Sequence, residues 1–302
     1  MKTYIITGAT RGLGLATAKQ LSQQPNSKVV LAVRDTQKAT ALTQHWGNNI
    51  EIQSLDLANL NSVDAFIKNW HTPIAGLMNN AGVQIVGNTR FTQQEGYEET
   101  ITVNHLAALK LSEGLAPYLN QGRVLFIGSG SHHPNNFTAG LFGFRGAQFE
   151  SIQNSIEGKP TSTSQRQAGM DRYATSKFLN MVTAVEMARR NSNLSIYCLD
   201  PGLMAGTGLV RTDAPIMIFG WKYLLPLIAW ALPESSTTTR SANAAVWLLT
   251  QPINHPSGTL FSFNKKPLKQ VWEKVYDTEL GQTILNDSLA LLRNTNVSPQ
   301  PC

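Results

Sequence analysis

The sequence is short of the residues that define several common classes of protein. It contains only two cysteines, Cys198 and Cys302, which is too few for a disulfide-stapled domain or a four-cysteine zinc site. Charged residues make up 15% of the 302 residues and hydrophobic residues 42%, a balance that excludes a disordered chain and a coiled coil. The net charge of +6 is spread along the chain without a long basic run, so no nucleic-acid-binding arm is indicated.

The sequence also gives no sign of export or of membrane insertion. Residues Lys2–Thr7 do not combine a charged region with a long apolar core and a cleavage site, so we expect a cytoplasmic protein. The most apolar stretch, residues 214–233, barely reaches the length of about 20 residues that spans a membrane, and a glycine, a lysine and a proline interrupt it. Contact of this stretch with a membrane surface stays open but is not favoured.

What the chain does contain is a series of short apolar runs separated by helix-like stretches. Runs rich in β-branched residues that alternate with helices are typical of a parallel sheet with helices on both faces. We expect strands at Tyr4–Thr7, Lys28–Val33, Ile50–Leu55, Gly76–Asn79, Arg123–Ile127, Leu194–Leu199 and Gly258–Phe263. The predicted fold class is therefore α/β, a single doubly wound parallel sheet of about seven strands within one domain, residues 1–302.

Two segments break this alternation. Residues 130–170 are polar and glycine-rich without a clear period, and a structureless loop of that length is uncommon in a compact domain. We therefore expect this segment to cover a site or to carry short irregular structure. Residues 206–233 form the second, apolar segment, and we treat both as insertions on one domain rather than as linkers.

A glycine motif follows the first predicted strand and opens a helix expected at Leu15–Gln23. The motif and its neighbours are Gly8, Thr10, Arg11, Gly12, Leu13 and Gly14. Glycines let the backbone turn tightly and approach a pyrophosphate, and the helix N-terminus offers N–H groups to the anion. A strand before the glycines and a helix after them predict a Rossmann-type dinucleotide site.

The end of the second predicted strand bears on the choice of dinucleotide. Enzymes that prefer NAD place an acid near this position to hold the ribose 2′-hydroxyl. Here Arg34 comes first, and Arg34 and Arg11 would together grip a 2′-phosphate, because guanidinium matches phosphate oxygens. We expect NADP(H), although Asp35 follows directly and two ordinary surface arginines are the alternative.

Further motifs follow in a fixed order along the chain: Asn79-Asn80-Ala81-Gly82, Asn104, Ser129, Tyr173-x-x-x-Lys177 and Pro201-Gly202. Together with the glycine motif, they make nearly the whole chain similar to the short-chain dehydrogenase/reductase family. The resemblance implies that Asn80, Ala81, Gly82, Pro201 and Gly202 contact the cofactor. It also implies an adenine contact at Asp56 and Leu57, for which a helix cap is the alternative.

The chemistry centres on Tyr173 and Lys177. They are four residues apart on a helix expected at Arg172–Arg189, so they share one face. A free phenol has a pKa of about 10 and exchanges protons poorly at pH 7, and a nearby ammonium lowers that value. Tyr173 would then be the general acid for carbonyl reduction or the base for alcohol oxidation. By resemblance, Lys177 also holds the nicotinamide ribose.

The resemblance assigns two supporting residues. Ser129 would donate a hydrogen bond to the reacting oxygen, with Ser131 as its rival, and Asn104 would support a relay water beside Lys177. His132 and His133 are expected to be solvated loop residues, and no metal site is predicted. A nucleophilic hydrolase is disfavoured because the Gly-x-Ser-x-Gly turn is absent.

Local similarity is closest to the branch that contains retinol dehydrogenases and light-dependent protochlorophyllide reductases. Segments Gly12–Lys19, Pro201–Leu209 and Ser257–Asn264 resemble the protochlorophyllide enzymes. So does the gap of 44 residues between Ser129 and Tyr173. The chain departs from those enzymes because it has no cysteine in the long loop before the tyrosine.

The same resemblance places a substrate lid after Pro201-Gly202, so we expect residues 206–233 to be an apolar lid. Four phenylalanines in the long loop would form the facing wall or serve a plain structural role: Phe137, Phe142, Phe144 and Phe149. We predict NADP(H)-dependent interconversion of a carbonyl and an alcohol on an apolar substrate, by a monomer or homodimer. Reduction of a C=C bond, as in protochlorophyllide reductases, and a catalytically idle dinucleotide sensor or scaffold are the alternatives.

Overall fold

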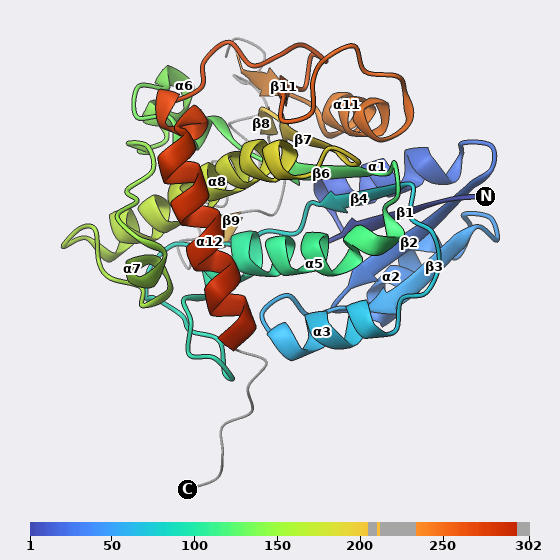
Figure 1. Ribbon diagram of the computed structural model, residues 1–302, viewed down its shortest axis with the longest axis horizontal. Coiled ribbons are helices and arrows are strands. Elements are labelled where there is room, and N and C mark those ends of the chain that lie inside the picture. The colour runs from blue at the N-terminus through green and yellow to red at the C-terminus, as the bar shows by residue number, and fades with distance from the viewer. Residues whose placement is uncertain (205–209, 212–233, 295–302) are drawn as a thin grey trace, which may run out of the picture.

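The computed structural model describes residues 1–204, 210–211 and 234–294, and its centre is a seven-stranded sheet (Figure 1). From one edge to the other the strands are β11 (Leu260–Ser262), β7 (Ser195–Asp200), β6 (Arg123–Ile127), β4 (Gly76–Asn79), β1 (Lys2–Thr7), β2 (Ser27–Val33) and β3 (Ile50–Ser54). Every neighbouring pair is parallel, which confirms the predicted doubly wound α/β fold. The winding reverses between β1 and β4, and such a reversal creates the crevice where these sheets bind ligands.

Alternate residues of each strand contribute to two separate hydrophobic cores. In β1, Ile5 belongs to one core, whereas Tyr4 and Ile6 belong to the other. In β6, Phe126 and Ile127 divide in the same way, and all five side chains are buried. Successive side chains of a strand point to opposite faces, so a sheet covered on both sides needs apolar residues throughout.

Helices cover both faces of this sheet (Figure 1). One core takes residues from α1 (Gly12–Ser22), α2 (Thr36–Thr43) and α11 (Thr238–Thr250). The other takes residues from α3 (Leu60–Lys68), α5 (Ala107–Leu115), α8 (Gln165–Arg190) and α12 (Thr278–Asn294). In Figure 1 the red helix α12 runs across α8, against which it packs.

Short elements connect these layers. The helical ones are α4 (Glu99–Ile101), the π-helix η1 (Thr102–Leu106), η2 (Ala116–Tyr118), η3 (Gly130–His132), α6 (Phe137–Leu141), α7 (Ile152–Ile156) and η6 (Glu273–Tyr276). Two small parallel pairs join β5 (Gln84–Ile85) to β9 (Val210–Arg211) and β8 (Leu203–Met204) to β10 (Ser235–Ser236). Residues 130–170 therefore carry short irregular structure, as the sequence predicted.

The expected helix boundaries needed correction. α1 begins at Gly12 rather than Leu15, because the glycine motif itself forms the first helical turn. α8 begins at Gln165 rather than Arg172, because the hydroxyl of Ser164 accepts a hydrogen bond from the backbone N–H of Gln167 and caps the helix there. The end of the 130–170 insertion thus belongs to the helix that carries Tyr173 and Lys177.

The predicted apolar lid, residues 206–233, lies outside the described residues except for the two residues of β9. Among the helices that the structure describes, none combines the length and the apolar character needed to cross a membrane.

Candidate active site

The glycine motif forms a tight turn between β1 and α1. Gly8 has a φ of 65°, in the left-handed region that favours glycine, and a Cβ there would lie 2.8 Å from the Cα of Ala81. A Cβ on Gly14 would lie 2.8 Å from the carbonyl oxygen of Gly8. Side chains are therefore excluded at both positions, which leaves the backbone bare at the start of α1.

Thr7 fastens this turn to the end of β4. Its hydroxyl oxygen accepts hydrogen bonds from the backbone N–H groups of Asn80 at 3.0 Å and Ala81 at 2.9 Å. The side-chain amide of Asn80 donates in return to the carbonyl oxygen of Thr7 at 2.8 Å. The two loops at the carboxyl ends of β1 and β4 therefore form one continuous edge. The sequence analysis gave Thr7 no such role.

Three cationic side chains, Arg11, Arg34 and Lys38, line one end of the cavity beside this edge. Asp35, which made the choice of dinucleotide uncertain, lines this cavity too and has a second role. Its carboxylate accepts a hydrogen bond from the backbone N–H of Lys38 at 2.9 Å and caps α2. No sequence pattern marked Lys38, which lies three residues after Asp35 on α2.

Asp56 and Leu57 line the same cavity, as predicted for an adenine contact. The carboxylate of Asp56 accepts a hydrogen bond from the backbone N–H of Ala58 at 3.1 Å, which closes a local turn. The alternative role of Asp56 as a helix cap is wrong, because Asn59 caps α3.

Tyr173 and Lys177 lie on the inner face of α8, with 5% and 4% of their surfaces exposed. The Nζ atom of Lys177 lies 5.6 Å from the ring centroid of Tyr173 and donates to the carbonyl oxygen of Ile127 at 3.1 Å. Burial lowers the pKa of Lys177 to about 8, while the charge of Asp200 raises it. Helix periodicity has therefore brought the two predicted catalytic side chains together.

The pKa of Tyr173 differs from the sequence-based expectation. Burial raises it above its ordinary value, the charge of Asp200 raises it further, and a side-chain hydrogen bond with Ser129 lowers it. We had expected the ammonium of Lys177 to lower this pKa. That expectation is wrong here, because a deeply buried phenol is costly to ionise.

Ser129 follows the end of β6 and lines the cavity. A hydrogen bond between its hydroxyl and Tyr173 lowers the pKa of that phenol, and its bond to a reacting oxygen stays a prediction. Ser131, the rival residue, donates its own hydroxyl hydrogen to the Oγ atom of Ser129 at 3.0 Å. Ser131 therefore supports Ser129 in this arrangement.

His132 is buried, with 1% of its surface exposed, so its expected place in a solvated loop is wrong. Its Nδ1 atom lies 2.7 Å from the carbonyl oxygen of Ser129, and its Nε2 atom accepts a hydrogen bond from the backbone N–H of Trp272 at 3.3 Å. The first contact requires a proton on Nδ1 and the second requires Nε2 to be bare, so the ring is neutral. Burial lowers the pKa of His132 to about 4, in agreement.

Asn104 lies in the π-helix η1, a kind of irregularity found often at functional sites. Its Oδ1 atom accepts a hydrogen bond from the backbone N–H of Val83 at 2.8 Å, and its Nδ2 atom donates to the hydroxyl of Ser176 at 2.8 Å. Asn104 does not line the cavity but lies behind Gly82, where a Cβ would come within 3.4 Å of its Oδ1 atom. It thus joins the loop after β4 to the catalytic helix.

Asp200, at the end of β7, is a site residue that the sequence analysis missed. Its Oδ1 atom accepts a hydrogen bond from the backbone N–H of Gly202 at 2.9 Å, and Gly130 gives it another backbone hydrogen bond. Burial raises the pKa of Asp200 to about 6, the charge of Glu234 adds to this, and Lys177 opposes it. Asp200 directly precedes the predicted Pro201-Gly202 motif, and that position was the available signal.

One cavity of about 410 Å³ unites these groups. Its lining includes Ser129, Tyr173, Lys177 and all the predicted cofactor residues except one: Gly8, Thr10, Arg11, Gly12, Leu13, Arg34, Asp56, Leu57, Asn80, Ala81, Gly82, Pro201 and Gly202. The exception is Gly14, which serves the packing of the turn. The cavity therefore runs from the cationic end to the Ser129–Tyr173–Lys177 group.

Two of the four predicted wall residues border this cavity. Phe142 and Phe144 line it, and the ring of Phe144 lies against Tyr173 with centroids 5.9 Å apart. Phe149 instead packs against Phe178 in the core, at 6.1 Å. Phe137 points away, with 72% of its surface exposed.

Comparison with known proteins agrees with the fold and the motifs. The family model described as short chain dehydrogenase matches residues 2–140. A protochlorophyllide reductase from Cucumis sativus is 30% identical, over 93% of this chain and 75% of the relative. The dehydrogenase/reductase SDR family member FEY of Arabidopsis thaliana is 30% identical, over 96% and 78%.

Two solved structures share the fold. A Mycobacterium paratuberculosis protein has a TM-score of 0.73 and 22% identity, covering 97% of this chain and 94% of that one. The carbonyl reductase Sniffer of D. melanogaster has a TM-score of 0.61 and 19% identity, covering 90% and 100%. The chain therefore belongs to the short-chain dehydrogenase/reductase family, related to the branch that contains the protochlorophyllide reductases. Members of this family are oxidoreductases that use a nicotinamide dinucleotide.

Proposed function

We propose that the protein is an NADP(H)-dependent oxidoreductase that interconverts a carbonyl and an alcohol on an apolar substrate. One observation carries the proposal: Ser129, Tyr173 and Lys177 line one cavity, which Phe142 and Phe144 border. Within it, the Nζ atom of Lys177 lies 5.6 Å from the ring centroid of Tyr173. A proton donor, a second hydroxyl and a cation thus face one apolar space. That combination suits the polarisation and protonation of a carbonyl oxygen.

The cavity fits a dinucleotide phosphate. The bare backbone at Gly8 suits close approach of a pyrophosphate, and the N-terminus of α1 adds a partial positive charge. Arg11, Arg34 and Lys38 would hold a 2′-phosphate at the cationic end. At the other end, a Cβ on Gly82 would lie 3.6 Å from the Nζ atom of Lys177, so this glycine leaves room for a ribose beside the ammonium.

When bound, the nicotinamide supplies or accepts the hydride. Ser129 would donate a hydrogen bond to the substrate oxygen, and Tyr173 would hold at Oη the proton that this oxygen takes up. Burial and the charge of Asp200 keep that proton on Tyr173 at neutral pH, so the phenol is in the protonated form that carbonyl reduction needs. Lys177, with a pKa of about 8, remains an ammonium at pH 7 and would stabilise the phenolate left behind.

Reduction of a C=C bond is the second candidate function, because of the named relatives. Several protochlorophyllide reductases match this chain, among them one from Pisum sativum that is 32% identical over 86% of this chain and 69% of the relative. In such a reaction the same tyrosine would deliver a proton to carbon. Cys198 lies within β7 and is buried, and burial raises the pKa of its thiol, so this thiol is not a reactive one.

The test is consumption of NADPH in the dark with a panel of apolar aldehydes and ketones. Turnover that disappears in Tyr173→Phe supports carbonyl reduction. NADPH binding without turnover on any member of the panel contradicts it. Repeating the assay with protochlorophyllide, in darkness and under light, then separates the C=C reductase from a sensor that only binds the dinucleotide. A cytoplasmic location and a monomeric or homodimeric state stay predictions.

A further inference from the structure

The segment that carries Phe144 is held against the catalytic helix by a buried carboxylate. Asp171 lies two residues before Tyr173 on α8, and its side chain is 1% exposed. The Nε atom of Arg145 donates to its Oδ1 atom at 3.1 Å, and the Nη2 atom donates to its Oδ2 atom at 2.6 Å. This two-point contact fixes the guanidinium plane as well as its position.

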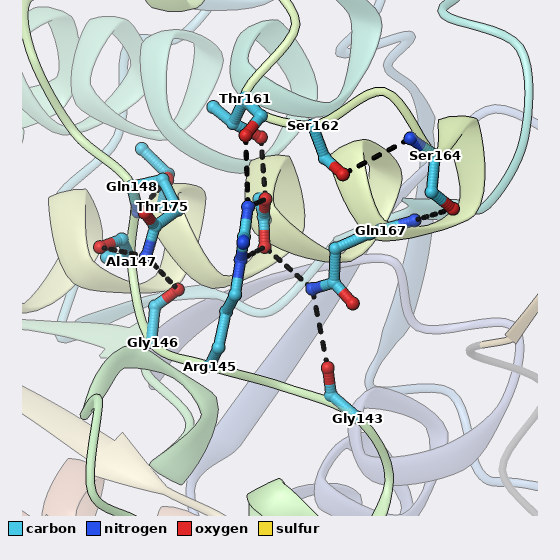
Figure 2. Close-up of polar contacts among 11 residues, drawn as sticks. Gly143, Arg145, Gly146, Ala147, Gln148, Thr161, Ser162, Ser164, Gln167 and Thr175 are labelled. Atoms are coloured by element: carbon cyan, nitrogen blue, oxygen red, sulfur yellow. Dashed lines mark hydrogen bonds and ion pairs between the residues drawn. The ribbon is translucent and has the colours of Figure 1, made fainter.

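Other polar groups of the insertion converge on the same carboxylate (Figure 2). Thr161 donates its hydroxyl hydrogen to Asp171 at 2.6 Å, and the side-chain amide of Gln167 donates at 2.8 Å. Arg145 also donates to the carbonyl oxygen of Thr161 at 3.0 Å. Burial alone would raise the pKa of Asp171, but the hydrogen bonds from Arg145, Thr161 and Gln167 hold it below its ordinary value. The network therefore joins two parts of the insertion, at Arg145 and at Thr161, to one point on α8.

Two glycines let the chain present Phe144 and Arg145 in different directions. Gly143 has a φ of 88° and Gly146 a φ of 87°, both in the left-handed region. A Cβ on Gly146 would lie 2.6 Å from the Cα of Pro134, so no other residue fits there. Between the two glycines, Phe144 contacts Tyr173 while Arg145 contacts Asp171.

A second attachment follows directly. The backbone N–H of Gln148 donates to the hydroxyl of Thr175 at 3.0 Å, and Thr175 lies one helical turn after Asp171. The backbone N–H of Ala147 donates to the carbonyl oxygen of His132 at 3.0 Å. These bonds fix the chain after Gly146.

Before Gly146, the backbone N–H of Phe144 donates to the carbonyl oxygen of Ala139 at 3.2 Å and the side chain of Gln167 donates to that of Gly143 at 3.4 Å. Arg145 is the charged attachment next to Phe144.

We propose that Arg145 and Asp171 are positioning residues that set substrate specificity, by holding Phe144 against Tyr173 as an aromatic wall for flat apolar substrates. This rests on the proposed carbonyl chemistry for its substrate class. Surface ion pairs contribute little to stability, but Asp171 is buried, and removal of Arg145 leaves its carboxylate with hydrogen bonds from Thr161 and Gln167 but without an ion pair. Replacement of Arg145 is therefore expected to weaken substrate binding at the Phe144 wall and to leave cofactor binding unchanged.

The test compares 4-phenylbutan-2-one with butan-2-one, two ketones that differ by one phenyl group. Arg145→Gln should raise KM for the phenyl ketone about tenfold and leave kcat, and KM for butan-2-one, within about twofold. Arg145→Lys should recover part of the loss, because an ammonium keeps the charge but not the two-point contact. Arg166→Gln, an exposed arginine on the same helix, is the matched control and should change neither KM.

A binding measurement separates this proposal from the proposed function. The dissociation constant of 4-phenylbutan-2-one, measured by calorimetry in the presence of NADP⁺, needs no turnover. Arg145→Gln and Phe144→Leu should each weaken this binding about tenfold, and the double variant should be no worse than either alone. Three results would overturn the proposal. They are unchanged binding in Arg145→Gln, an equal loss of binding for both ketones and NADP⁺, and additive losses in the double variant. Absence of turnover with intact binding differences would instead refute only the carbonyl chemistry.

Discussion

Asp200 and Lys177 are oppositely charged groups of the same cavity, and each shifts the pKa of the other. Burial lowers the pKa of Lys177, and the charge of Asp200 opposes this by raising it. Burial and the charge of Glu234 raise the pKa of Asp200, and the charge of Lys177 lowers it. The same carboxylate raises the pKa of Tyr173. Asp200 therefore acts on both side chains that the proposed proton transfer uses.

This relationship predicts a pH profile. Lys177 has a pKa of about 8, so reductase activity should fall as its ammonium deprotonates above that pH. Asp200→Asn removes the charge that raises the pKa of Lys177, so the fall should begin about half a unit to one unit lower in pH. The measurement is kcat/KM between pH 5 and pH 10. If kcat/KM of Asp200→Asn falls at the same alkaline pH as that of the wild type, the carboxylate does not act on the pKa of Lys177.

The cationic end of the cavity predicts cofactor preference. Arg34→Asp should weaken NADPH binding, because an acid repels the 2′-phosphate. The ratio of kcat/KM for NADPH to that for NADH should shift at least tenfold toward NADH, because the acid also accepts a hydrogen bond from a 2′-hydroxyl. Lys38→Ala should shift the ratio in the same direction, but less. Arg166→Asp makes the same charge change on α8, away from the cofactor end, and should leave the ratio unaltered. An unaltered ratio in Arg34→Asp would refute the phosphate assignment.

His132 predicts how stability depends on pH. Its pKa is about 4 in the folded protein against an ordinary 6.5, so the unfolded chain takes up a proton first as the pH falls. The contribution of neutral His132 to the free energy of unfolding is complete above pH 6.5. It is lost as the pH falls to about 4, and the loss is on the order of 3 kcal/mol. In urea titrations, His132→Asn should flatten this loss, whereas His71→Asn, at an exposed histidine, should not. Equal slopes for His132→Asn and the wild type would contradict the assignment.

Two glycines of the insertion predict opposite responses to the same substitution. Gly146→Ala forces a side chain into a left-handed conformation and against Pro134, so it should destabilise the protein by about 1–3 kcal/mol. Gly140→Ala meets open space within α6 and should be neutral or slightly stabilising. Melting temperatures check both, with a drop of several degrees expected only for Gly146→Ala. Equal melting temperatures would mean that the turn at Gly146 can relax.

The strands and the motif residues could be predicted from the sequence because their signals are local. A continuous apolar run such as Val29–Val33 marks a strand buried on both faces, and the four-residue spacing of Tyr173 and Lys177 places both on one helix face. Residues 130–170 gave a weaker signal. Their short helices depend on caps such as Asn136 and on glycine turns that have no period.

The parts that escaped prediction depend on contacts between distant segments. His132 is buried and accepts a hydrogen bond from the backbone N–H of Trp272, 140 residues later, a contact that no local pattern shows. Asp200 belongs to the site because β7 ends beside Gly130, and its place before the Pro201-Gly202 motif does not show which charges its carboxylate meets. The direction of the Tyr173 pKa shift was predicted wrongly for the same reason: a sequence displays a nearby ammonium but not the depth of burial.

The most direct test of the proposed chemistry is a comparison of single turnovers in the dark for the wild type and Tyr173→Phe, with NADPH and 4-phenylbutan-2-one. Tyr173→Phe removes the hydroxyl and keeps the ring that packs against Phe144. The rate of NADPH oxidation should fall by about 10²–10⁴-fold, the usual contribution of a positioned general acid, while the dissociation constant of NADPH changes less than about twofold. A rate within tenfold of the wild type would contradict Tyr173 as the proton donor.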